Sequence, residues 1–482
     1  MLKRHWHHFL LLLLLVDLGY SFWQYQQFPL DGDLAPIVWP DQNYVAVLHD
    51  PFGLRALLKH EMYSAPNRFF AHYFIYEYFR HVPLWLHTWL SPLDSLYFAC
   101  ALVKLAVHLL ILYVFGAAIS NSRNVLGKGF VLAAVLVTPL LQACGFYEKM
   151  GVLDWSITYT CFYALPLSLL LLFFLPFLRA ALHGTPVRLS ALGYVAEIGL
   201  IVWLSLNGPT IPATVLLVCP VALLVVWYRR FAVGPATEPV VRRFFRAIGA
   251  MPRAVIWLFG LFILTSLYSL YIGTFNAENL WATLPLAERY ARLPLGVYYQ
   301  LSSKLGFPLL LLLLLVNGWL IRRQAGSPAA RRVLTALQWL GAFALVYVLL
   351  LPLGGYREYR HYIIRRDSIL PVILGMMGFF ALSAYYLLTR LSGAAHRRYA
   401  AAIAVFLGIF TFADKPRRDD FNACEKQLFA RLAQAPGPIV RLPADCTMMD
   451  WQPLTDYKKS ELNGQMLHYW GVLNTPKLYY QR

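Results

Sequence analysis

Long runs of hydrophobic residues alternate with short polar segments along almost the whole chain. Runs such as FLLLLLLV at 9–16, LSLLLLFFLPFL at 167–178 and PLLLLLLLVNGWL at 308–320 carry no charge, which is typical of helices surrounded by lipid. Inside a bilayer the backbone has no water to bond with, so each run must satisfy its own hydrogen bonds as a helix. The pattern therefore predicts an all-α, polytopic membrane protein.

We predict eleven membrane-spanning helices from these runs. They are expected at 6–25, 95–118, 129–147, 156–178, 189–206, 211–228, 254–272, 304–321, 333–352, 368–389 and 399–413. Lys3 and Arg4 ahead of the first run would also suit a cleaved signal peptide. No small-x-small cleavage site follows in DLGYSFWQYQQ, so we expect a retained membrane anchor.

Basic side chains gather in every second connection between the predicted helices. With the N-terminus inside, the inner segments are 1–5, 119–128, 179–188, 229–253, 322–332 and 390–398. Together they hold nineteen Lys and Arg residues against one acid, Glu238. Inner loops of membrane proteins carry such an excess, so the pattern predicts an N-in, C-out chain. The formal net charge of +18 thus reflects topology and does not indicate nucleic-acid binding.

The longer connections then fall on the outer side. They are a first loop at 26–94, a second loop at 273–303, a compact loop at 353–367 and a tail at 414–482. We expect residues 1–413 to form the transmembrane domain and the tail to form a small mixed α/β unit outside the membrane.

Two of the six cysteines, Cys424 and Cys446, lie in the tail. An oxidising outer compartment would join them in a disulfide. The chain has no Asn-x-Ser/Thr sequon, which favours a bacterial periplasm over a eukaryotic lumen. We therefore expect a multi-pass protein of the bacterial inner membrane with its active surface facing the periplasm.

Two stretches of the first outer loop have apolar residues at helical spacing. DPFGLRALLKHEMY at 50–63 suits an amphipathic helix that lies along the membrane surface. In the next stretch, Ser64 and Pro66 are typical of the start of a second helix, which continues to about residue 90. The first outer loop is therefore predicted to contain interfacial helices.

The second of these helices carries a polar stripe, because Arg68, His72, Tyr76 and Arg80 recur every four residues on one side. The stripe has two interpretations. One is a solvated face of an interfacial helix. The other is a substrate groove, in which the surrounding aromatic rings stack on sugars while Arg68 and His72 bind phosphate.

Two aspartates bracket one glycine directly after the first predicted span, in FPLDGDLAPIVWP at 28–40. Asp31 and Asp33 would lie at the membrane surface, where partial dehydration can raise the pKa of a carboxylate toward that of a general base. Gly32 would permit close approach of a substrate. The alternative is a simple turn, because Asp and Gly both favour turns.

A second pair of acids, Glu148 and Asp154, follows the third predicted span on the same side of the membrane. They are either ordinary residues of a short outer loop or further members of a catalytic site.

Arginines crowd the compact outer loop LPLGGYREYRHYIIRRDSILP at 351–371, against the usual preference of membrane proteins. Guanidinium groups bind phosphate oxygens in a bidentate manner, and tyrosines add hydroxyl donors. We predict a phosphate site here, with anchoring to lipid headgroups or pairing with Glu358 and Asp367 as the alternative. Its members are Tyr356, Arg357, Arg360, Arg365 and Arg366.

The order of these features resembles the C-type superfamily of glycosyltransferases, which includes the protein O-mannosyltransferases and the aminoarabinose transferases of lipid A. The resemblance covers the whole transmembrane portion. It implies a polyprenyl-phosphate sugar as donor and an inverting transfer on the outer face. It also implies a catalytic carboxylate at Asp31 or Asp33 and a second acid at Glu148 or Asp154. The tail is smaller than in both examples, which leaves the acceptor, a lipid or a glycan, open.

The residues suit such chemistry. A phosphate leaving group needs no general acid, so one carboxylate can deprotonate the acceptor hydroxyl while arginines stabilise the departing phosphate. Asp31 and Asp33 are also able to hold a divalent cation such as Mg²⁺ or Mn²⁺, as in some members of the superfamily. No other cofactor is expected.

Two other classes of membrane protein remain alternatives. A secondary transporter or lipid flippase would use Asp17 and Glu197, the acids expected inside spans, for proton coupling. A lipid-linked polysaccharide ligase would use the outer arginines, but it has no obvious need for acids directly after the first span.

Overall fold

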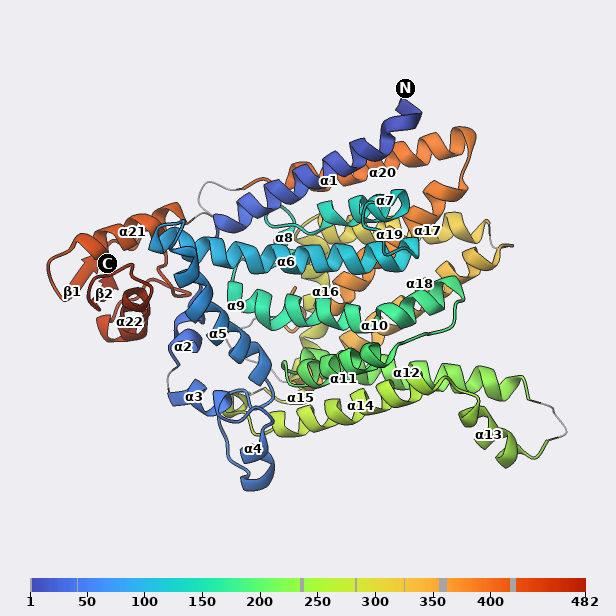
Figure 1. The fold of residues 1–482 in the computed structure, drawn as a ribbon, viewed down its shortest axis with the longest axis horizontal. Coiled ribbons are helices and arrows are strands. Elements are labelled where there is room, and N and C mark those ends of the chain that lie inside the picture. The colour runs from blue at the N-terminus through green and yellow to red at the C-terminus, as the bar shows by residue number, and fades with distance from the viewer. Residues whose placement is uncertain are drawn as a thin grey trace.

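The structure is a computed structural model that describes residues 2–40, 42–234, 238–281, 284–324, 326–354, 362–416 and 422–482. Its helices run side by side between two ends of the molecule (Figure 1). Within these residues, seven helices are long and apolar enough to cross a membrane, or eight if the bent pair Leu286–Ser302 and Gly306–Arg322 forms one span. The chain is therefore a multi-pass helical membrane protein.

The long apolar helices match predicted spans. They are α1 (Leu2–Gln26), α6 (Pro92–Ser120), α9 (Ile157–Tyr159) continuing through η2 (Thr160–Ala164) into α10 (Leu165–His183), α12 (Thr210–Ala232), α14 (Arg253–Gly273), α18 (Pro328–Leu350) extended by η4 (Leu351–Gly354), and α19 (Leu370–Arg390).

Shorter or more polar helices occupy the other predicted spans. They are α7 (Lys128–Val137) continued by η1 (Thr138–Leu140), α11 (Ala191–Ser205), α17 (Gly306–Arg322) and α20 (Gly393–Ala413). At 10 and 15 residues, α7 and α11 are shorter than the roughly 20 residues that a straight crossing requires. All eleven predicted positions are thus helical, but they differ in length and polarity.

The main hydrophobic core lies where α6, α7, α10 and α19 meet. Val107, Ala134 and Phe380 are completely buried there. Gly116 permits close packing of α6 and α7, because a Cβ atom at this position would lie 2.7 Å from the ring of Phe130. This core provides a rigid support for the loops at the helix ends.

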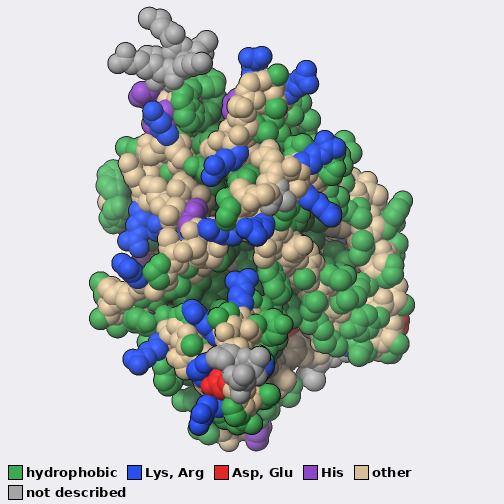
Figure 2. Space-filling model, turned by 90° about the vertical axis from the view of Figure 1, so that its right-hand side faces the viewer, with side chains coloured by type: hydrophobic (Ala, Val, Ile, Leu, Met, Phe, Trp, Pro, Cys, Tyr) green, Lys and Arg blue, Asp and Glu red, His purple; other side chains and the backbone are tan. Residues whose placement is uncertain are grey.

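One end of the helix bundle is strongly basic, and we call it the basic end. Figure 2 shows this face, on which Lys and Arg side chains far outnumber acidic ones. It includes the amphipathic helix α13 (Val240–Gly249). Exposed arginines on its loops and helix ends include Arg123, Arg188, Arg230, Arg242, Arg322 and Arg398. They belong to the segments that the sequence assigns to the inner side.

The opposite end, which we call the site end, carries the first loop, the second loop and the tail, and Figure 1 shows the first loop and the tail at its left. The first loop forms α2 (Leu34–Val38), α3 (Gln42–Leu48), α4 (Leu54–Lys59) and α5 (Phe69–Leu86). The second loop forms η3 (Ala277–Trp281), α15 (Leu286–Ala291) and α16 (Leu293–Ser302). A single turn, α8 (Tyr147–Met150), follows α7. The helices predicted at 50–63 and 64–90 are therefore α4 and α5.

The tail is a mixed unit that contains α21 (Ala423–Gln434), β1 (Ile439–Leu442), η6 (Tyr457–Ser460), α22 (Glu461–Tyr469) and β2 (Leu478–Gln481). The strands β1 and β2 pair in parallel, with Ile439 opposite Leu478. The predicted disulfide joins Cys424 to Cys446, with their Cα atoms 6.3 Å apart.

The tail packs onto the first loop instead of standing apart from the membrane domain. Phe79 of α5 and Trp470 of the tail are both fully buried in one shared cluster. The Trp470 indole also donates a hydrogen bond of 2.8 Å to the Phe79 carbonyl. The tail and the first loop therefore form one layer above the membrane helices.

Candidate active site

Asp31 is a buried carboxylate that four donors hold in place. Its Oδ2 accepts from the Ser156 hydroxyl at 2.9 Å and from the Thr158 backbone N–H at 3.1 Å. Its Oδ1 accepts from the Thr158 hydroxyl at 2.8 Å and from the Asp33 backbone N–H at 3.1 Å. Each oxygen therefore accepts one backbone and one hydroxyl hydrogen. Asp31 organises the loop, and its crowded oxygens make it the less suitable of the two aspartates for the role of a general base.

Asp33 differs from Asp31 because it remains partly exposed. Its Oδ1 accepts a hydrogen bond of 3.1 Å from the Trp451 indole. Burial, assisted by the negative charge of Asp31, raises the pKa of Asp33 to about 6, while the Trp451 hydrogen bond and the charge of Arg68 oppose this rise. A carboxylate with this pKa is largely ionised at neutral pH, yet it binds a proton more readily than an ordinary aspartate. Asp33 is thus suited to act as a general base.

Gly32 has a structural purpose that differs from the predicted one. A Cβ atom at this position would lie 2.9 Å from the Trp451 ring and 3.0 Å from the Trp451 backbone nitrogen. The missing side chain admits the tail, and in this way it brings Trp451 against Asp33.

Residues 154–158 connect the aspartates to the arginine loop. Ser156 caps α9, since its hydroxyl accepts from the Tyr159 backbone N–H at 3.0 Å. Asp154 precedes this cap and accepts from the Ser156 backbone N–H at 2.9 Å and from the Tyr147 hydroxyl at 2.6 Å. The segment therefore directs the hydroxyls of Ser156 and Thr158 toward Asp31 and the carboxylate of Asp154 toward Tyr147.

Arg366 forms an ion pair with that carboxylate of Asp154. Its guanidinium carbon lies 3.8 Å from the centroid of the Tyr147 ring, in a cation–π contact. The Nη1 atom is buried and has no hydrogen-bond partner among the described residues. An unsatisfied buried donor is costly, so a bound acceptor such as a phosphate oxygen would stabilise this arrangement.

The segment thus links an acid loop and an arginine. At one end it holds Asp31, which neighbours Asp33, and at the other it holds Arg366. Since each residue spans at most about 3.6 Å, the Cα atoms of Asp154 and Thr158 lie within about 14 Å of each other. One short stretch of chain therefore brings a general-base candidate and a phosphate-binding candidate into the same region.

Lys104 supports the segment from below. It is 1% exposed, and its ammonium group donates a hydrogen bond of 2.6 Å to the Trp155 carbonyl. It also lies 4.6 Å from the centroid of the Phe28 ring. Through Lys104, the membrane helix α6 thereby fixes the position of residues 154–158.

Arg68 and His72 have different environments. Arg68 is partly exposed, and its guanidinium group lies 4.8 Å from the centroid of the Phe162 ring. Gly208, at a φ of +95°, leaves room for this guanidinium, since a Cβ there would lie 2.8 Å from Arg68 Nε. The positive charge of Arg68 lowers the pKa of Asp33, so Arg68 is still a candidate for binding an anion.

His72 does not suit the phosphate-binding role that the sequence predicts. It is 2% exposed and its ring centroid lies 5.1 Å from that of Tyr44 and 5.2 Å from that of Phe162. Burial lowers the pKa of His72 to about 4, so the ring is neutral at pH 7. Its Nδ1–H donates to the Arg68 carbonyl at 3.0 Å, which orients the start of α5.

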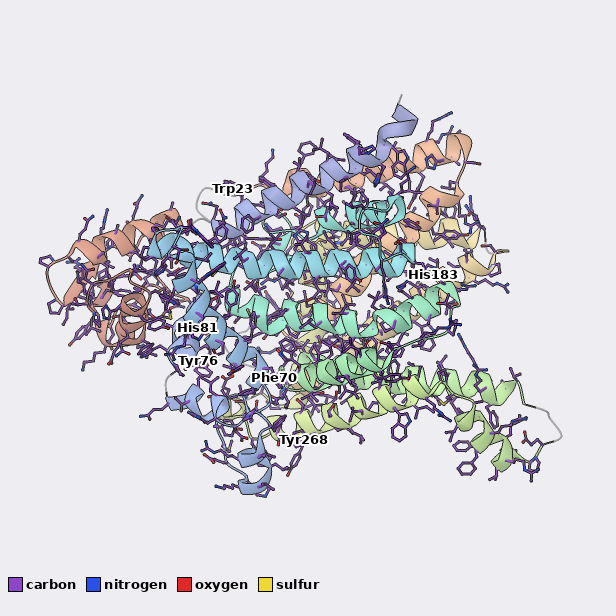
Figure 3. All side chains as sticks on the ribbon, in the orientation of Figure 1. Trp23, Phe70, Tyr76, His81, His183 and Tyr268 are labelled. Carbon is purple, nitrogen blue, oxygen red and sulfur yellow. A yellow bond between two sulfur atoms is a disulfide. The ribbon has the colours of Figure 1, made fainter. Side chains whose placement is uncertain are left out.

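The remainder of the α5 stripe connects to the tail. Arg80 donates a hydrogen bond of 2.5 Å to the Tyr76 hydroxyl and also contacts the rings of Trp39 and Tyr469. Figure 3 shows Tyr76 and His81 on α5 at the site end, far from His183 near the basic end. Tyr76 and Arg80 therefore contribute to the junction between α5 and the tail.

Other predicted site residues are not brought to this segment by the contacts that the structure describes. Glu148 is exposed, and it pairs with Lys304 at 3.6 Å. Arg365 forms an ion pair with Asp367. Tyr356, Arg357 and Arg360 lie outside the described residues, so the central part of the arginine loop is still a prediction.

Trp451 is the site residue that sequence reasoning missed. It is 50% exposed and comes from the far end of the chain, and its ring centroid lies 5.3 Å from that of Tyr159. The only signal was a lone tryptophan between the polar residues Asp450 and Gln452.

A divalent cation at Asp31 and Asp33, which the sequence leaves open, would have to displace the donors around Asp31. Both oxygens of Asp31 face N–H and O–H donors, whose hydrogens would repel a cation. Across the described parts of the chain, no three His, Cys, Asp or Glu side chains form a group that could hold a metal ion.

The two acids inside predicted spans also have distinct surroundings. Asp17 accepts a hydrogen bond of 2.5 Å from Thr138, whose hydroxyl lies 3.0 Å from His108 Nε2. His108 Nδ1 in turn lies 3.0 Å from the Tyr25 hydroxyl, so Asp17 belongs to a network that joins α1, α6 and η1. Glu197 Oε2 is buried without a partner among the described residues.

Comparisons with known proteins found no matching family model, no matching curated protein and no matching solved structure.

Proposed function

We propose that this protein is a membrane glycosyltransferase, which transfers a sugar from a polyprenyl-phosphate donor to a hydroxyl of a lipid or glycan acceptor. The observation that carries the proposal concerns the short segment 154–158. Its residue Thr158 binds Asp31, the near neighbour of Asp33, and its residue Asp154 pairs with Arg366. The basic end would face the cytoplasm of a bacterium and the site end its periplasm, in agreement with the positive-inside tendency.

In the proposed reaction Asp33 is the general base. Its carboxylate takes the proton of the acceptor hydroxyl as the hydroxyl oxygen attacks the anomeric carbon of the donor sugar. The bond between that carbon and the phosphate oxygen breaks, and the polyprenyl phosphate leaves with the electron pair. Attack from the face opposite the leaving group inverts the anomeric centre. Asp33 then returns its proton to water.

The arginines would bind the donor phosphate. Arg366 offers a buried, unpaired Nη1, and Arg68 adds positive charge on the side of Asp33. Their charges stabilise the additional negative charge that the phosphate acquires as it departs. Asp31 would position the loop and would not itself take a proton during the reaction.

The test uses the full-length protein in lipid nanodiscs and decaprenyl phosphate as the probe. Arg366→Lys keeps a positive charge beside Asp154 but loses the second nitrogen of the guanidinium, and we expect about ten- to a hundredfold weaker binding. Arg390→Lys, an exposed position at the basic end, is the matched control and should bind the probe normally.

Catalysis is tested separately by transfer of radiolabel from polyprenyl-phosphate sugars to membrane lipids and glycans. Asp33→Asn should bind decaprenyl phosphate normally and transfer about 10²–10⁴ times more slowly. Equal transfer by Asp33→Asn and the unmodified protein would refute the assignment of the base. Binding without any transfer would instead favour a flippase or transporter, for which Glu197 is the residue to examine next.

A further inference from the structure

Trp451 is unusual because the tail holds a large aromatic side chain in a fixed but exposed position. It is 50% exposed, whereas Trp470 of the same tail is completely buried. Burial of an aromatic ring stabilises a fold, so an exposed and well-positioned ring is more typical of binding.

Several contacts fix the backbone ahead of Trp451. Met449 adopts a left-handed conformation with a φ of +49°, which is strained for a residue with a side chain. Its N–H donates to Glu425 Oε1 at 3.1 Å, and its carbonyl accepts from Asn463 at 3.2 Å. Asp450 Oδ1 accepts from the Trp451 N–H at 2.6 Å. The tail thus forms a defined turn that projects the indole.

Glu425 ties this turn to the aspartate loop. It is 1% exposed, and its Oε2 accepts from the Leu30 N–H at 3.0 Å and from the Tyr97 hydroxyl at 2.7 Å. One carboxylate therefore holds both the loop before Asp31 and the turn before Trp451. As a result, the position of Trp451 relative to Asp33 is set by the fold.

The projected ring and its neighbours have the chemistry of a sugar site. Trp451 and Tyr159 lie at an interplanar angle of 44°, and the indole N–H donates to Asp33. A pyranose ring has an apolar face of C–H groups, which can lie against an aromatic ring, and an edge of hydroxyls, which a carboxylate binds. Binding sites generally combine such apolar walls with a few convergent polar groups.

We propose that Trp451 and Tyr159 together form the aromatic surface of a pyranose-binding subsite next to Asp33, with Trp451 supplied by the C-terminal tail. This inference rests on the proposed function. The pyranose is either the sugar that is transferred or a sugar of the acceptor, and the chemistry of the subsite is the same for both.

A role as a membrane anchor is less consistent with the contacts of Trp451. Trp85 and Trp89, also exposed at the site end, contact each other edge to face with centroids 4.9 Å apart and suit an interfacial belt. The Trp451 N–H is instead directed at a carboxylate of the candidate active site.

The first test measures binding without catalysis. Methyl pyranosides of several hexoses and pentoses are mixed with the protein in nanodiscs, and saturation-transfer NMR reports their contact with it. We expect Trp451→Ala to abolish the signal of the bound pyranosides and Trp89→Ala, the matched control, to keep it. Absence of any pyranoside contact in the unmodified protein, or an equal signal from Trp451→Ala, would overturn the subsite regardless of the transfer assay.

The second test identifies the source of the sugar. Trp451→Ala should bind decaprenyl phosphate normally, because that probe has no sugar. About tenfold weaker binding of a polyprenyl-phosphate sugar would assign the subsite to the donor, and about a tenfold higher KM for the acceptor would assign it to the acceptor. Unchanged values of both would overturn the proposal. Pyranoside contact without any transfer activity would refute only the proposed function.

A third variant separates stacking from hydrogen bonding. Trp451→Phe keeps an aromatic ring but loses the donor to Asp33, a donor that lowers the pKa of this carboxylate. The variant should retain pyranoside contact, while the acidic limb of its pH–rate profile moves to higher pH. Loss of pyranoside contact in Trp451→Phe would contradict stacking on the ring, and an unchanged limb would contradict the action of the indole N–H on Asp33.

Discussion

Replacement of Asp31 by asparagine tests the division of labour between the two aspartates. Each of the two oxygens of Asp31 accepts one hydrogen bond from a backbone N–H and one from a hydroxyl. In Asp31→Asn, one of these oxygens becomes an NH2 group. The Ser156 or Thr158 hydroxyl beside it can turn to accept a hydrogen bond, but the backbone N–H beside it cannot.

Whichever way the new amide is oriented, one N–H therefore loses its acceptor, either the partly buried N–H of Asp33 or the buried N–H of Thr158. A buried donor without a partner costs about 1–3 kcal/mol. Removal of the charge offsets part of this cost, because burial raises the pKa of Asp31 and so disfavours its ionised form. We expect the net loss in the free energy of unfolding of Asp31→Asn to be smaller than this full cost, about 1–2 kcal/mol.

The measurement is reversible unfolding by SDS in mixed micelles, with Asp33→Asn as the matched variant. Asp33 accepts one hydrogen bond, from the Trp451 indole, and the amide oxygen of asparagine can accept it as well. Asp33→Asn should therefore lower stability by less than about 0.5 kcal/mol, since removal of the desolvated charge acts in the stabilising direction, while most transfer is lost. A stable Asp31→Asn beside a destabilised Asp33→Asn would refute the assignment of the two roles.

Three further predictions concern the tail and the topology. Replacement of Cys424 and Cys446 by serine should lower the free energy of unfolding by about 3 kcal/mol, measured in the same micelles, because the disulfide closes a loop with a sequence separation of 22. Burial raises the pKa of Glu425 from 4.5 to about 7, so the folded state retains a proton that the unfolded state loses, and stability should fall as pH rises through this window. That fall should be smaller in Glu425→Gln, and an equal pH dependence in both proteins would contradict the assignment. A reporter fused after Arg482 should be active only if it requires the periplasm, and activity of a cytoplasmic reporter there would reverse the proposed orientation.

Features of the site that involve neighbouring residues were accessible from the sequence. The acids at Asp31 and Asp33, the start of α5 and the excess of bases at one end all follow from local patterns. The same patterns could not rank Asp31 against Asp33, because the two residues have the same chemistry and lie two positions apart. They differ because Ser156 and Thr158 donate hydrogen bonds to Asp31, whereas Trp451 donates one to Asp33.

For His72, the sequence pattern suggested a role that the surroundings of the ring do not favour. Its spacing from Arg68 places both on one side of a helix, and a histidine near an arginine suggested phosphate binding. The stripe does not reveal that Tyr44 and Phe162 enclose the ring. Burial by residues from other elements removes its charge at neutral pH.

The sequence by itself determined the membrane architecture, the basic end and the pairing of Cys424 with Cys446. Each depends on the total hydrophobicity, charge or cysteine content of a segment. Such properties can be obtained from the segment alone, without knowing which distant residues contact it. Only the tertiary structure decided which aspartate Ser156 and Thr158 hold, which acid pairs with Arg366 and which aromatic ring contacts Asp33. The contacts of Asp31 with Ser156, Asp154 with Arg366 and Asp33 with Trp451 span 125, 212 and 418 residues of sequence. Hydrogen bonds and ion pairs act over a few ångströms, so only the packing of the tail and loops on the membrane helices could bring these groups together.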